Sequence, residues 1–586
     1  MTPILGFIIK SGQLCTVGGK NILFGVNNVL SSLLSVKQRR RGAAMINLDF
    51  FKAYDRVMLS FLLLVMKKMN FSDKFCSWVK MLHAGAKTRF ILQSLTKLVC
   101  LSFSIRQGDP LAMILYIIYI EPLLMYLERK LVGLKLGRSL TQCVDAYCDD
   151  VNVMTDKISD FYILDEAVRK FESISGAILS RDKKCKVMGI GSWSSKVEWP
   201  LDYLKNVNEI KVFGIFIQDS YRSLLKRNWD FRFGKFLDAI KSWKSRILDT
   251  LLQRVEVLKL FAFSRVYYVA SILPINATTI KRFEKEVGKF LWNASGKVLR
   301  VSMDELKNCP EKGGLGLPCL RNRSKALLMS QLLRLLKSGD RKSLSHVGYW
   351  MGELLGDLVD GIDDGEHAQD VPAYFDHLSQ IVVEVKSSDY FNQCSWKNLT
   401  SKTIYVNFLK SLANPKVERD AGVSYKEVWK RSMSRVLTSC ARDVLFLLIH
   451  NKHPVRERLF RIGLLVDPYC DSCVGAEVCD IEHFFCTCPR VSAVWEDVRG
   501  MLEAVLGVNR RNCSDWNLLN LQFPRAMGDD QCVWLIGTYI AEVWDQIYTR
   551  GRLRLKKEEF FGFLRFKYKT SQELGASLGV IPGLAV

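Results

Sequence analysis

AYCDDVNVM, residues 146–154, places two adjacent aspartates, Asp149 and Asp150, between two short apolar runs. On both sides of the pair the apolar residues recur at every second position, so the stretch predicts a strand, a tight turn and a second strand. Solvated hairpin tips often carry Asp, and an ordinary turn is therefore the favoured explanation of the pair taken alone. The pair indicates chemistry only if a third acid, a metal and a substrate follow from elsewhere in the chain.

A third carboxylate comes from MINLDFFKAYDRV, residues 45–57. Asp49 stands at the end of an apolar run, where a strand would bring it to the edge of a sheet. Carboxylate oxygens suit Mg²⁺, which takes its other ligands from water and substrate phosphates. Two such ions side by side can activate an attacking hydroxyl and stabilise the leaving oxygens of a phosphoryl transfer. Asp49, Asp149 and Asp150 are therefore candidate metal ligands.

The size and charge of the chain favour a large globular protein with a polyanionic partner. Its 586 residues exceed what one core can organise, and 48% hydrophobic with 11% aromatic residues exclude a disordered tail. The formal charge is +24, with 84 Lys and Arg against 60 Asp and Glu. Nucleic acid is the leading partner on this evidence, and a membrane surface stays open as an alternative.

The sequence predicts neither a membrane span nor secretion. The most apolar run, Leu111–Ile120, ends at Glu121, too early to cross a bilayer. The N-terminal stretch MTPILGFIIK lacks the charged region of a signal peptide. Seventeen cysteines without an export signal predict reduced thiols, some of them metal-bound, in the nucleus or cytoplasm.

The order of elements predicts an α+β fold and four regions. Residues 1–220 alternate strand-like and helical runs, and the hairpins among them favour a mixed layer over a wound parallel sheet. Residues 221–345 are helical, basic and aromatic, and 346–450 combine an acidic linker with further helix. Residues 451–586 contain a segment rich in Cys and His.

CDSCVGAEVCDIEHFFCTC, residues 470–488, is a candidate zinc site. Nine residues separate a C-x2-C pair from the following H-x4-C. Three thiolates with one imidazole suit tetrahedral Zn²⁺. The predicted ligands of one Zn²⁺ are Cys470, Cys473, His483 and Cys488. Cys479 and Cys486 are spare, so the choice of ligands stays open, as does a small core of plain buried cysteines.

Several stretches, taken in order, resemble one known family. LDFFKAYDRV, RQGDPL and YCDD look like the successive palm motifs of reverse transcriptases, in wording similar to the LINE-type, non-LTR retrotransposon class. QLCTVGGKNI, SGAILSRDKK and EKGGLGLP resemble further stretches of that class, and IKVFGIFI resembles a single strand of it. The Cys/His segment resembles the zinc-binding tail of the class. The resemblance runs in order from Gln13 to the C-terminal cysteines, which is nearly the whole chain.

The resemblance implies a right-hand polymerase. Partial fingers and a palm with an antiparallel sheet would occupy residues 1–220, and a helical thumb 221–345. A helical connection would follow over 346–450, and a small zinc-binding domain over 451–586. The implied activity is RNA-directed DNA polymerase, a nucleotidyltransferase that extends a 3′-OH DNA primer with dNTPs on an RNA template. Two Mg²⁺ ions would serve the reaction.

A rival interpretation is an inactive or domesticated nucleic-acid-binding remnant of such an element. The charge and the Cys/His segment suit both interpretations, whereas the intact triad of acids favours the enzyme. The class normally carries an N-terminal endonuclease and more fingers sequence, so we expect a truncated element or a derived gene. The missing fingers favour the remnant, and a separate endonuclease is a candidate partner.

The resemblance also assigns roles at the site. Asp49 and Asp149 would bind both metal ions, Asp150 would complete the triad, and the backbone carbonyl of Phe50 would be a further ligand. Tyr54 would lie beneath the sugar and exclude a ribose 2′-OH. A core aromatic at helical spacing is the alternative explanation of Tyr54.

Further contacts follow from the same resemblance. Gln107 and Gly108 would lie against the incoming nucleotide and the template, although an ordinary turn before a helix explains them as well. Lys183 would sit near the triphosphate. Lys20 stands where the class has Arg, so a point charge replaces a bidentate grip on phosphate. Cys148 replaces the usual Ala of the YADD box.

Overall fold

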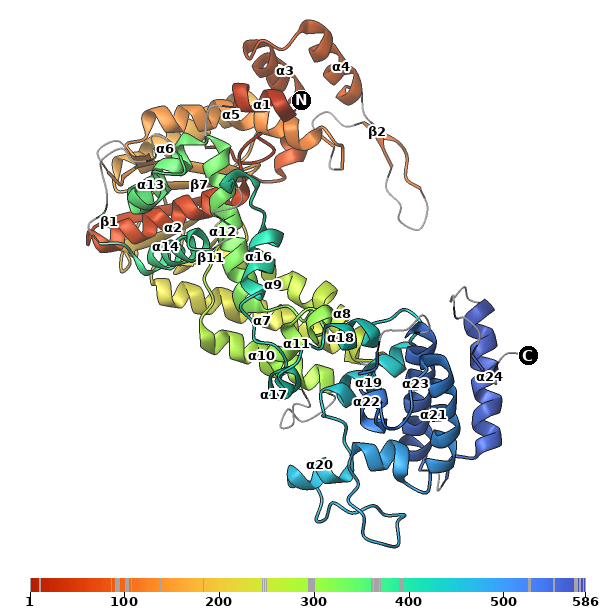
Figure 1. The fold of residues 1–586 in the computed structure, drawn as a ribbon. Helices are drawn as coiled ribbons and strands as arrows, with labels where there is room; N and C mark the ends of the chain where they lie inside the picture. The colour runs from red at the N-terminus through yellow and green to blue at the C-terminus, as the bar shows by residue number, and fades with distance from the viewer. Residues whose placement is uncertain are drawn as a thin grey trace. The chain divides into compact units, whose positions relative to one another are not determined.

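The fold is given by a computed structural model (Figure 1). It describes residues 2–9, 12–85, 87–89, 95–100, 105–106, 108–137, 140–182, 184–244, 246, 248, 250–292, 301–359, 362, 368, 370–388, 391, 395–524, 529–551, 554–573, 578, 581–582 and 584.

Residue contacts divide the chain into two compact units, each assembled from three segments. The first unit comprises Met1–Arg232, Tyr267–Ile275 and Arg323–Tyr405, and the second comprises Phe233–Val266, Asn276–Asn322 and Val406–Val586. The range expected to form a thumb, 221–345, contributes to both units. The four domain boundaries inferred from the sequence stay predictions.

A five-stranded sheet in the order β6–β7–β1–β8–β9 forms the centre of the first unit. Its strands are β1 Gly42–Leu48, β6 Val144–Tyr147, β7 Asp150–Thr155, β8 Lys186–Gly191 and β9 Lys205–Asn206. Ala44 of β1 lies opposite Thr155 of β7 and Gly189 of β8, both in antiparallel pairs, whereas β9 at the edge runs parallel to β8. The small and apolar side chains of GAAMINL let β1 take the buried central position.

The remaining strands are short. They form the pairs β2 Lys87–Thr88 with β3 Val99–Cys100, β4 Leu134–Lys135 with β5 Thr141–Gln142, and β10 Glu209–Val212 with β11 Ile215–Gln218. The stretch IKVFGIFI therefore folds as a hairpin rather than as the single strand that its resemblance implies. Phe213 and Gly214 form the turn with φ of 48° and 84°, a pair of left-handed residues that suits two-residue hairpin loops.

Helices account for most of the remaining described chain. Up to residue 244 they are α1 Thr2–Ile8, α2 Ile22–Gln38, η1 Ala53–Arg56, α3 Leu59–Lys68, α4 Asp73–His83, α5 Ala112–Lys130, α6 Ser159–Ser175 and α7 Tyr221–Lys244. From residue 251 to 409 they are α8 Leu251–Val257, η2 Leu258–Phe263, α9 Ser264–Ala270, α10 Ala277–Trp292, α11 Met303–Lys307, η3 Pro310–Lys312, α12 Leu320–Ser338, α13 Arg341–Leu355, α14 Ala373–Lys386, η4 Trp396–Asn398 and α16 Ser401–Leu409. The C-terminal helices are α17 Lys416–Ala421, α18 Lys426–Ser432, α19 Ser439–Ile449, α20 Arg456–Arg461, η5 His483–Thr487, α21 Ser492–Leu506, α22 Asp515–Leu519, α23 Asp529–Val543, η6 Trp544–Thr549 and α24 Lys557–Glu573.

The two faces of the five-stranded sheet pack against different helices. Ala44, Ile46 and Leu48 alternate along β1 and share one core with α3, α5 and α6. α2 contacts β6 and β8, and α13 packs on α2. Because the second set of helices reaches β6 from the other face, a buried residue such as Asp145 can meet side chains from α2 and α13.

The second unit has a separate helical core. α19 and α21 both pack on α23, and Trp495 and Tyr539 are in ring contact within the core that these helices share. The Tyr539 hydroxyl donates to the carbonyl of Phe485, which connects α23 to the Cys/His segment. This arrangement, with the mostly antiparallel sheet of the first unit, confirms the predicted α+β class.

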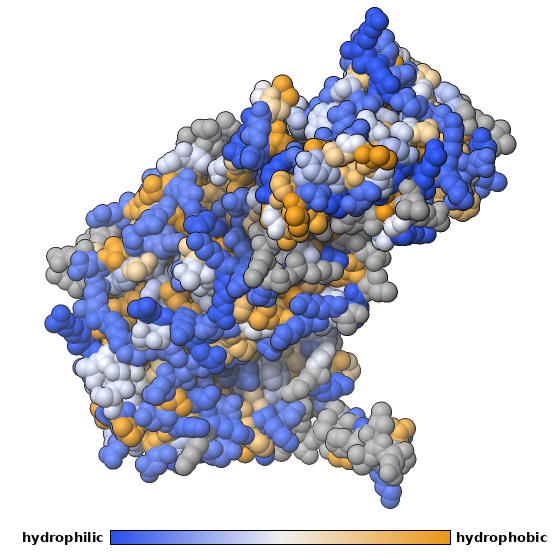
Figure 2. All heavy atoms as spheres, turned by 90° about the horizontal axis from the view of Figure 1, so that it is seen from below, coloured by the Kyte–Doolittle hydropathy of each residue, from blue (hydrophilic) through white to orange (hydrophobic). Residues whose placement is uncertain are grey.

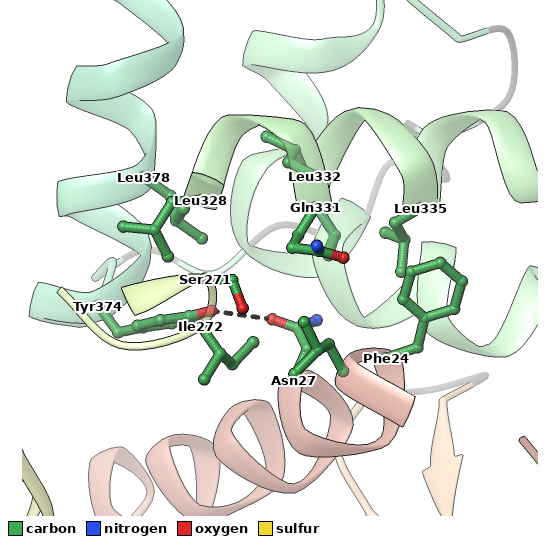
Figure 3. A pocket seen from close by; sticks show the side chains of 12 residues that line it. Phe24, Asn27, Ser271, Ile272, Leu328, Gln331, Leu332, Leu335, Tyr374 and Leu378 are labelled. Atoms are coloured by element: carbon green, nitrogen blue, oxygen red, sulfur yellow. Dashed lines mark hydrogen bonds between the residues drawn. The ribbon is translucent and has the colours of Figure 1, made fainter. Parts of the chain in front are cut away.

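A small cavity of about 30 Å³ lies in the first unit among α2, α12 and α14 (Figure 3). The Tyr374 hydroxyl lies 3.4 Å from Oδ1 of Asn27 across it, and Phe24 and Leu328 contribute to its lining. Its volume corresponds to about one water molecule. The cavity is therefore too small for a nucleotide.

The surface is rich in charged side chains. Figure 2 shows hydrophilic residues over much of the visible face, with hydrophobic patches between them. Among the helices of the described residues, none combines the length and the apolarity that a bilayer span requires.

Candidate functional site

The hairpin predicted around the paired aspartates is present. Tyr147 of β6 pairs with Asp150 of β7, so Cys148 and Asp149 form the turn. Cys148 has a φ of 55°, a left-handed conformation that is uncommon for a residue with a side chain. Gln13 holds this turn, because its Oε1 accepts from the Cys148 amide at 3.0 Å and its Nε2 donates to the Cys148 carbonyl at 3.4 Å.

Asp49 reaches the same edge of the sheet. Leu48, the last residue of β1, lies opposite Val151, and one further step in this register sets Asp49 opposite Asp150. The carbonyl of Asp49 accepts from the Ser180 amide at 2.8 Å, which fixes the backbone there. The structure thus brings the three predicted acids to one end of neighbouring strands.

Two amides hold the carboxylate of Asp150. Its Oδ1 accepts from Nδ2 of Asn47 at 2.8 Å and from Nδ2 of Asn152 at 3.2 Å. Burial raises the pKa of Asp150, and these two hydrogen bonds oppose the rise. Burial also raises the pKa of Asp149, and the nearby charge of Asp49 raises it further. Adjacent carboxylates whose charged forms are disfavoured are an arrangement that a divalent cation relieves.

The donor set fits Mg²⁺ in kind. The three side chains offer only oxygen atoms, the ligands that this hard cation prefers. Among the described residues, four ligand atoms of the Cys/His segment lie within 4.8 Å of one another. The carboxylate oxygens of Asp49, Asp149 and Asp150 do not form such a cluster.

The carbonyl of Phe50 takes no part in the pairing with residues 178–180. Phe50 pairs with Leu179, and the flanking bonds come from the Phe51 amide to Ile178 and from the Ser180 amide to Asp49. In such an antiparallel pair the central residue turns its own amide and carbonyl away from the partner. The Phe50 carbonyl therefore points away from residues 178–180, while its side chain is buried.

Tyr54 lies beside the β6–β7 hairpin, whose turn contains Cys148 and Asp149. It belongs to η1, and its ring stacks on Tyr116 with centroids 4.8 Å apart and planes at 27°. Burial raises the pKa of Tyr54, as do a hydrogen bond with Cys148 and the charge of Asp149. The half-buried ring therefore stands next to the turn that carries Asp149.

The other predicted contacts differ in what the structure describes. Gly108 has a φ of 90° and open space around it, so its left-handed turn rather than close packing requires glycine. Lys20 is half-buried and precedes α2 in the chain. Burial raises the pKa of Glu128, and the charge of Lys20 is one of the influences that lower it again. Gln107 and Lys183 lie outside the described residues.

A buried ionic network beneath the hairpin was not anticipated from the sequence. Asp145 on β6 is 1% exposed, and Lys342 on α13 places its Nζ 3.1 Å from Oδ1 of Asp145. The same Nζ donates to the Val144 carbonyl at 2.6 Å. Gln142 and Asn28 donate to the two carboxylate oxygens at 2.7 and 3.4 Å. An acid at a core position of a strand is the signal that a buried partner exists, but the partner's identity is not in the local sequence.

A second site forms in the Cys/His segment. The four predicted ligands come together, and one atom of each lies within 4.8 Å of the others: Cys470, Cys473, His483 and Cys488. The Sγ atoms of Cys470 and Cys488 are 3.9 Å apart, and Sγ of Cys473 is 3.4 Å from Nε2 of His483. Zn–S bonds of about 2.3 Å at a tetrahedral angle give sulfur atoms roughly 3.8 Å apart, so the spacing fits one Zn²⁺.

The surroundings of this cluster orient its ligands. Nδ1 of His483 lies 3.1 Å from Oε2 of Glu477 and 3.2 Å from Oγ1 of Thr487, which leaves Nε2 to face the thiols. Burial alone would raise the pKa of Cys470, but hydrogen bonds from the Ser472 backbone and the side chains of its cluster lower it to about 7. A thiol with such a pKa readily supplies the thiolate that zinc binds.

The two spare cysteines, Cys479 and Cys486, do not belong to the cluster of four ligand atoms found in the described part of the chain. Burial raises the pKa of Cys479 to about 12, and it also raises the pKa of Cys486. Both thiols belong to the helical core of the second unit. Cys470 and Cys488 belong to the same core, so these two cysteines differ from the spare pair in the clustering of their sulfur atoms with Cys473 and His483.

Comparison with known proteins places the first site in a family. Residues 13–217 match the family described as reverse transcriptase (RNA-dependent DNA polymerase). The chain is 25% identical over 346 residues to the transposon TX1 uncharacterized 149 kDa protein of Xenopus laevis, covering 57% of this chain and 26% of that protein. It is 23% identical over 297 residues to the retrovirus-related Pol polyprotein from type-2 retrotransposable element R2DM of Drosophila melanogaster, covering 48% and 27%. The chain thus spans about a quarter of the length of each of these relatives.

Solved structures with some likeness include two telomerases. The chain resembles telomerase from Candida tropicalis in complex with a TWJ fragment of telomeric RNA, with a TM-score of 0.28 and 11% identity, over 66% of this chain and 52% of that one. For the corresponding Candida albicans complex the TM-score is 0.22 and the identity 10%, over 54% and 53%.

The matched range contains the whole five-stranded sheet, and it contains the separate β10–β11 hairpin except for its last residue, Gln218. Asp49 and the hairpin of Asp149 and Asp150 lie inside it. Both curated relatives belong to transposable elements. Residues 13–217 therefore form a reverse transcriptase domain of the non-LTR retrotransposon class.

Proposed function

We propose that this chain is an RNA-directed DNA polymerase, which extends a 3′-OH DNA primer with dNTPs on an RNA template. The observation that carries the proposal is the meeting of Asp49 with the Cys148–Asp149 turn at one sheet edge, inside a reverse transcriptase domain. The net charge of +24 supports a nucleic-acid partner. The most plausible native template is the transcript of the element itself.

The aspartates would hold the metal ions of the reaction. Asp49, Asp149 and the Phe50 carbonyl are the proposed Mg²⁺ ligands, and Asp150 completes the triad. Two Mg²⁺ ions supply activation of the primer hydroxyl and stabilisation of the leaving pyrophosphate when they are bound. Asn47 and Asn152 fix the carboxylate of Asp150, so this side chain is preorganised behind the reacting groups.

The other residues of the site would bind and select the nucleotide. The ring of Tyr54, held against Tyr116, would occupy the space of a ribose 2′-OH. Gly108 would let the backbone approach the base pair, with Gln107 beside it. Lys183 and Lys20 would contact phosphates through their charges.

The Cys/His cluster would bind one Zn²⁺ and stabilise a nucleic-acid-binding surface in the second unit. The clustering of one ligand atom each from Cys470, Cys473, His483 and Cys488 supports the metal. α20 lies upstream with the sequence RERLFR, whose cations could contact a phosphate backbone.

Replacement of Asp149 by Asn tests the polymerase. We expect loss of Mg²⁺-dependent primer extension on RNA by at least about a thousandfold, because a charged ligand is removed from the reaction centre. RNA affinity, measured by filter binding, should stay within about twofold, since the basic surface is unchanged.

The matched control is Asp202→Asn, which alters an exposed acid of the first unit. It should extend primers like the parent. An Asp149→Asn variant with parental extension would overturn the active-site assignment. A parent protein that binds RNA but never extends a primer would favour the nucleic-acid-binding remnant instead.

A further inference from the structure

A short N-terminal segment, residues 12–15, pairs with β6 of the hairpin that carries Asp149, which we call the catalytic hairpin. Gln13 pairs with Ala146 of β6 in a parallel bridge, with the Ala146 amide bonded to Gly12 at 3.1 Å and the Leu14 amide bonded to Ala146 at 2.8 Å. A Cβ on Gly12 would meet the Val144 carbonyl at 2.1 Å, so only glycine allows this approach. The segment is therefore held in one register along β6.

This register brings two thiols together. Two residues beyond the bridge on each strand stand Cys15 and Cys148, and their Sγ atoms are 3.0 Å apart. Both cysteines are free and buried, with exposed fractions of 0% and 5%. Gln13 ties the two strands across this point, because its Oε1 accepts from the amides of Cys15 and Cys148 at 3.1 and 3.0 Å.

The usual spacing of strands in a sheet is compatible with a covalent bond between cysteines on neighbouring strands. Neighbouring strands lie about 4.8 Å apart, which falls inside the range of Cα separations that disulfides span. The two sulfur atoms need to approach by only about 1 Å to reach a bond length of about 2.05 Å. The fixed register and the short contact that it produces both point to the same pair.

We propose that Cys15 and Cys148 form a reversible disulfide that arrests the catalytic hairpin. The bond itself depends only on the thiol geometry, whereas its effect on DNA synthesis rests on the proposed function. Cys148 immediately precedes Asp149 and contacts Tyr54. Drawing its sulfur toward Cys15 moves the turn and breaks that contact, so the nucleotide site loses its geometry.

The oxidant is a peroxide. The sulfur of one cysteine attacks the O–O bond of hydrogen peroxide, which breaks as an S–O bond forms, and one water leaves. The sulfur of the other cysteine then attacks the sulfenic sulfur; the S–S bond forms, the S–O bond breaks, and the hydroxide takes up the remaining thiol proton as a second water. Two thiols are oxidised by two electrons and one peroxide is reduced to two waters. A dithiol reverses the bond by exchange.

Mass spectrometry tests the bond without any reference to activity. The full chain is reduced, treated with hydrogen peroxide, alkylated and digested. We expect a linked pair of peptides containing Cys15 and Cys148, lighter by two hydrogens than the two thiol peptides, that disappears with dithiothreitol. Both cysteines recovered as separate alkylated or overoxidised peptides would overturn the proposal, as would Cys148 linked to another cysteine.

Primer extension tests the arrest. Peroxide should lower extension by the parent at least about tenfold, and dithiothreitol should restore it. Cys15→Ala, with Cys15→Ser as a second variant in case the first is poorly folded, should keep its extension under the same peroxide. Cys76→Ala alters another buried thiol of the first unit and should stay as sensitive as the parent.

The outcomes separate the two proposals. Equal loss in the parent and in both Cys15 variants would overturn the arrest. A reduced parent that does not extend primers would contradict the polymerase, while the linked peptides would still decide whether the disulfide forms.

Discussion

At the scale of single residues, Tyr54 is the side chain on which nucleotide choice should depend. Its ring is fixed from one side by Tyr116 and its hydroxyl is directed toward Cys148. A ring held in this way cannot move aside for an extra hydroxyl without losing both contacts. Discrimination between dNTPs and rNTPs would then follow from shape rather than from a hydrogen bond to the sugar.

Replacement of Tyr54 by Ala should admit ribonucleotides. We expect the ratio of dNTP to rNTP incorporation to fall by at least about tenfold, equivalent to about 1.4 kcal/mol, because the space of the 2′-OH becomes free. Single-nucleotide extension with each substrate measures the ratio. Tyr54→Phe keeps the ring and should keep the discrimination. An active Tyr54→Ala variant with the parental ratio would remove Tyr54 from the site.

The sequence alone located those residues whose role is local. Asp49, Asp149 and Asp150 could be named because strand ends and turn residues follow from short patterns. Asp145 could be recognised only as an acid on a buried strand, because its cation lies far along the chain. The proximity of Cys15 to Cys148 likewise depends on a strand pairing that no local pattern encodes.

At the scale of elements, α13 supports the strand that leads into the hairpin. Lys342 bonds both the Asp145 carboxylate and the Val144 carbonyl, and its Nζ is 3.8 Å from Glu128 of α5. His346, one turn further along α13, lies 3.1 Å from Oε1 of Gln142. Burial raises the pKa of Asp145, and Lys342 is the largest influence that opposes the rise.

Replacement of Lys342 by Met should destabilise the first unit. The variant leaves a buried carboxylate without its cation, and we expect a loss of about 2 to 3 kcal/mol, at or below the usual cost for a buried pair because Lys342 is partly exposed. Urea unfolding followed by a fluorescence probe in this unit measures the loss. Primer extension should fall with it.

A double variant distinguishes the ion pair from simple packing. Lys342→Met combined with Asp145→Asn removes both charges and leaves an amide that Gln142 and Asn28 can still bond. The double variant should be more stable than Lys342→Met alone, with a coupling of about 1 kcal/mol or more. Additive losses would show that Asp145 and Lys342 do not act as a pair.

The elements themselves were predictable to different degrees. The long apolar run over residues 111–131 predicts a helix, and α5 continues through Pro122 because buried neighbours on most sides outweigh the lost backbone bond. The β10–β11 hairpin was missed because Phe213 occupies a turn position that Asn or Asp usually fills. The stretch AKTRFILQ, residues 86–93, also predicts a strand, and part of it lies outside the described residues.

At the scale of the whole molecule, the Cys/His cluster and the aspartates belong to different compact units. Each unit has its own hydrophobic core. A metal bound in the second unit should therefore stabilise that unit without supporting the sheet of the first. The interleaving of segments within each unit could not be predicted, because it depends on which distant helices pack together.

The purified protein should contain about one equivalent of zinc by elemental analysis. Cys470→Ser combined with Cys473→Ser should lose the metal, since two of four ligands are gone. Hydrogen exchange should then increase in η5 and its neighbours while β1 stays protected. Cys479→Ala, outside the cluster, should keep the metal. Metal-free protein prepared without chelator would mean that these residues are core cysteines.

The bond between Lys342 and Asp145 also sets an order of events during protein synthesis. Roughly 190 residues separate Lys342 from the end of β7. At ribosomal rates of about 5 to 20 residues per second, the strands of the hairpin emerge roughly 10 to 40 s before their cation does. In that interval the nascent sheet carries a carboxylate that it cannot yet enclose at low cost. The hairpin should therefore reach its final packing only after α13 has left the ribosome, and messages that end before codon 342 should yield chains that chaperones retain.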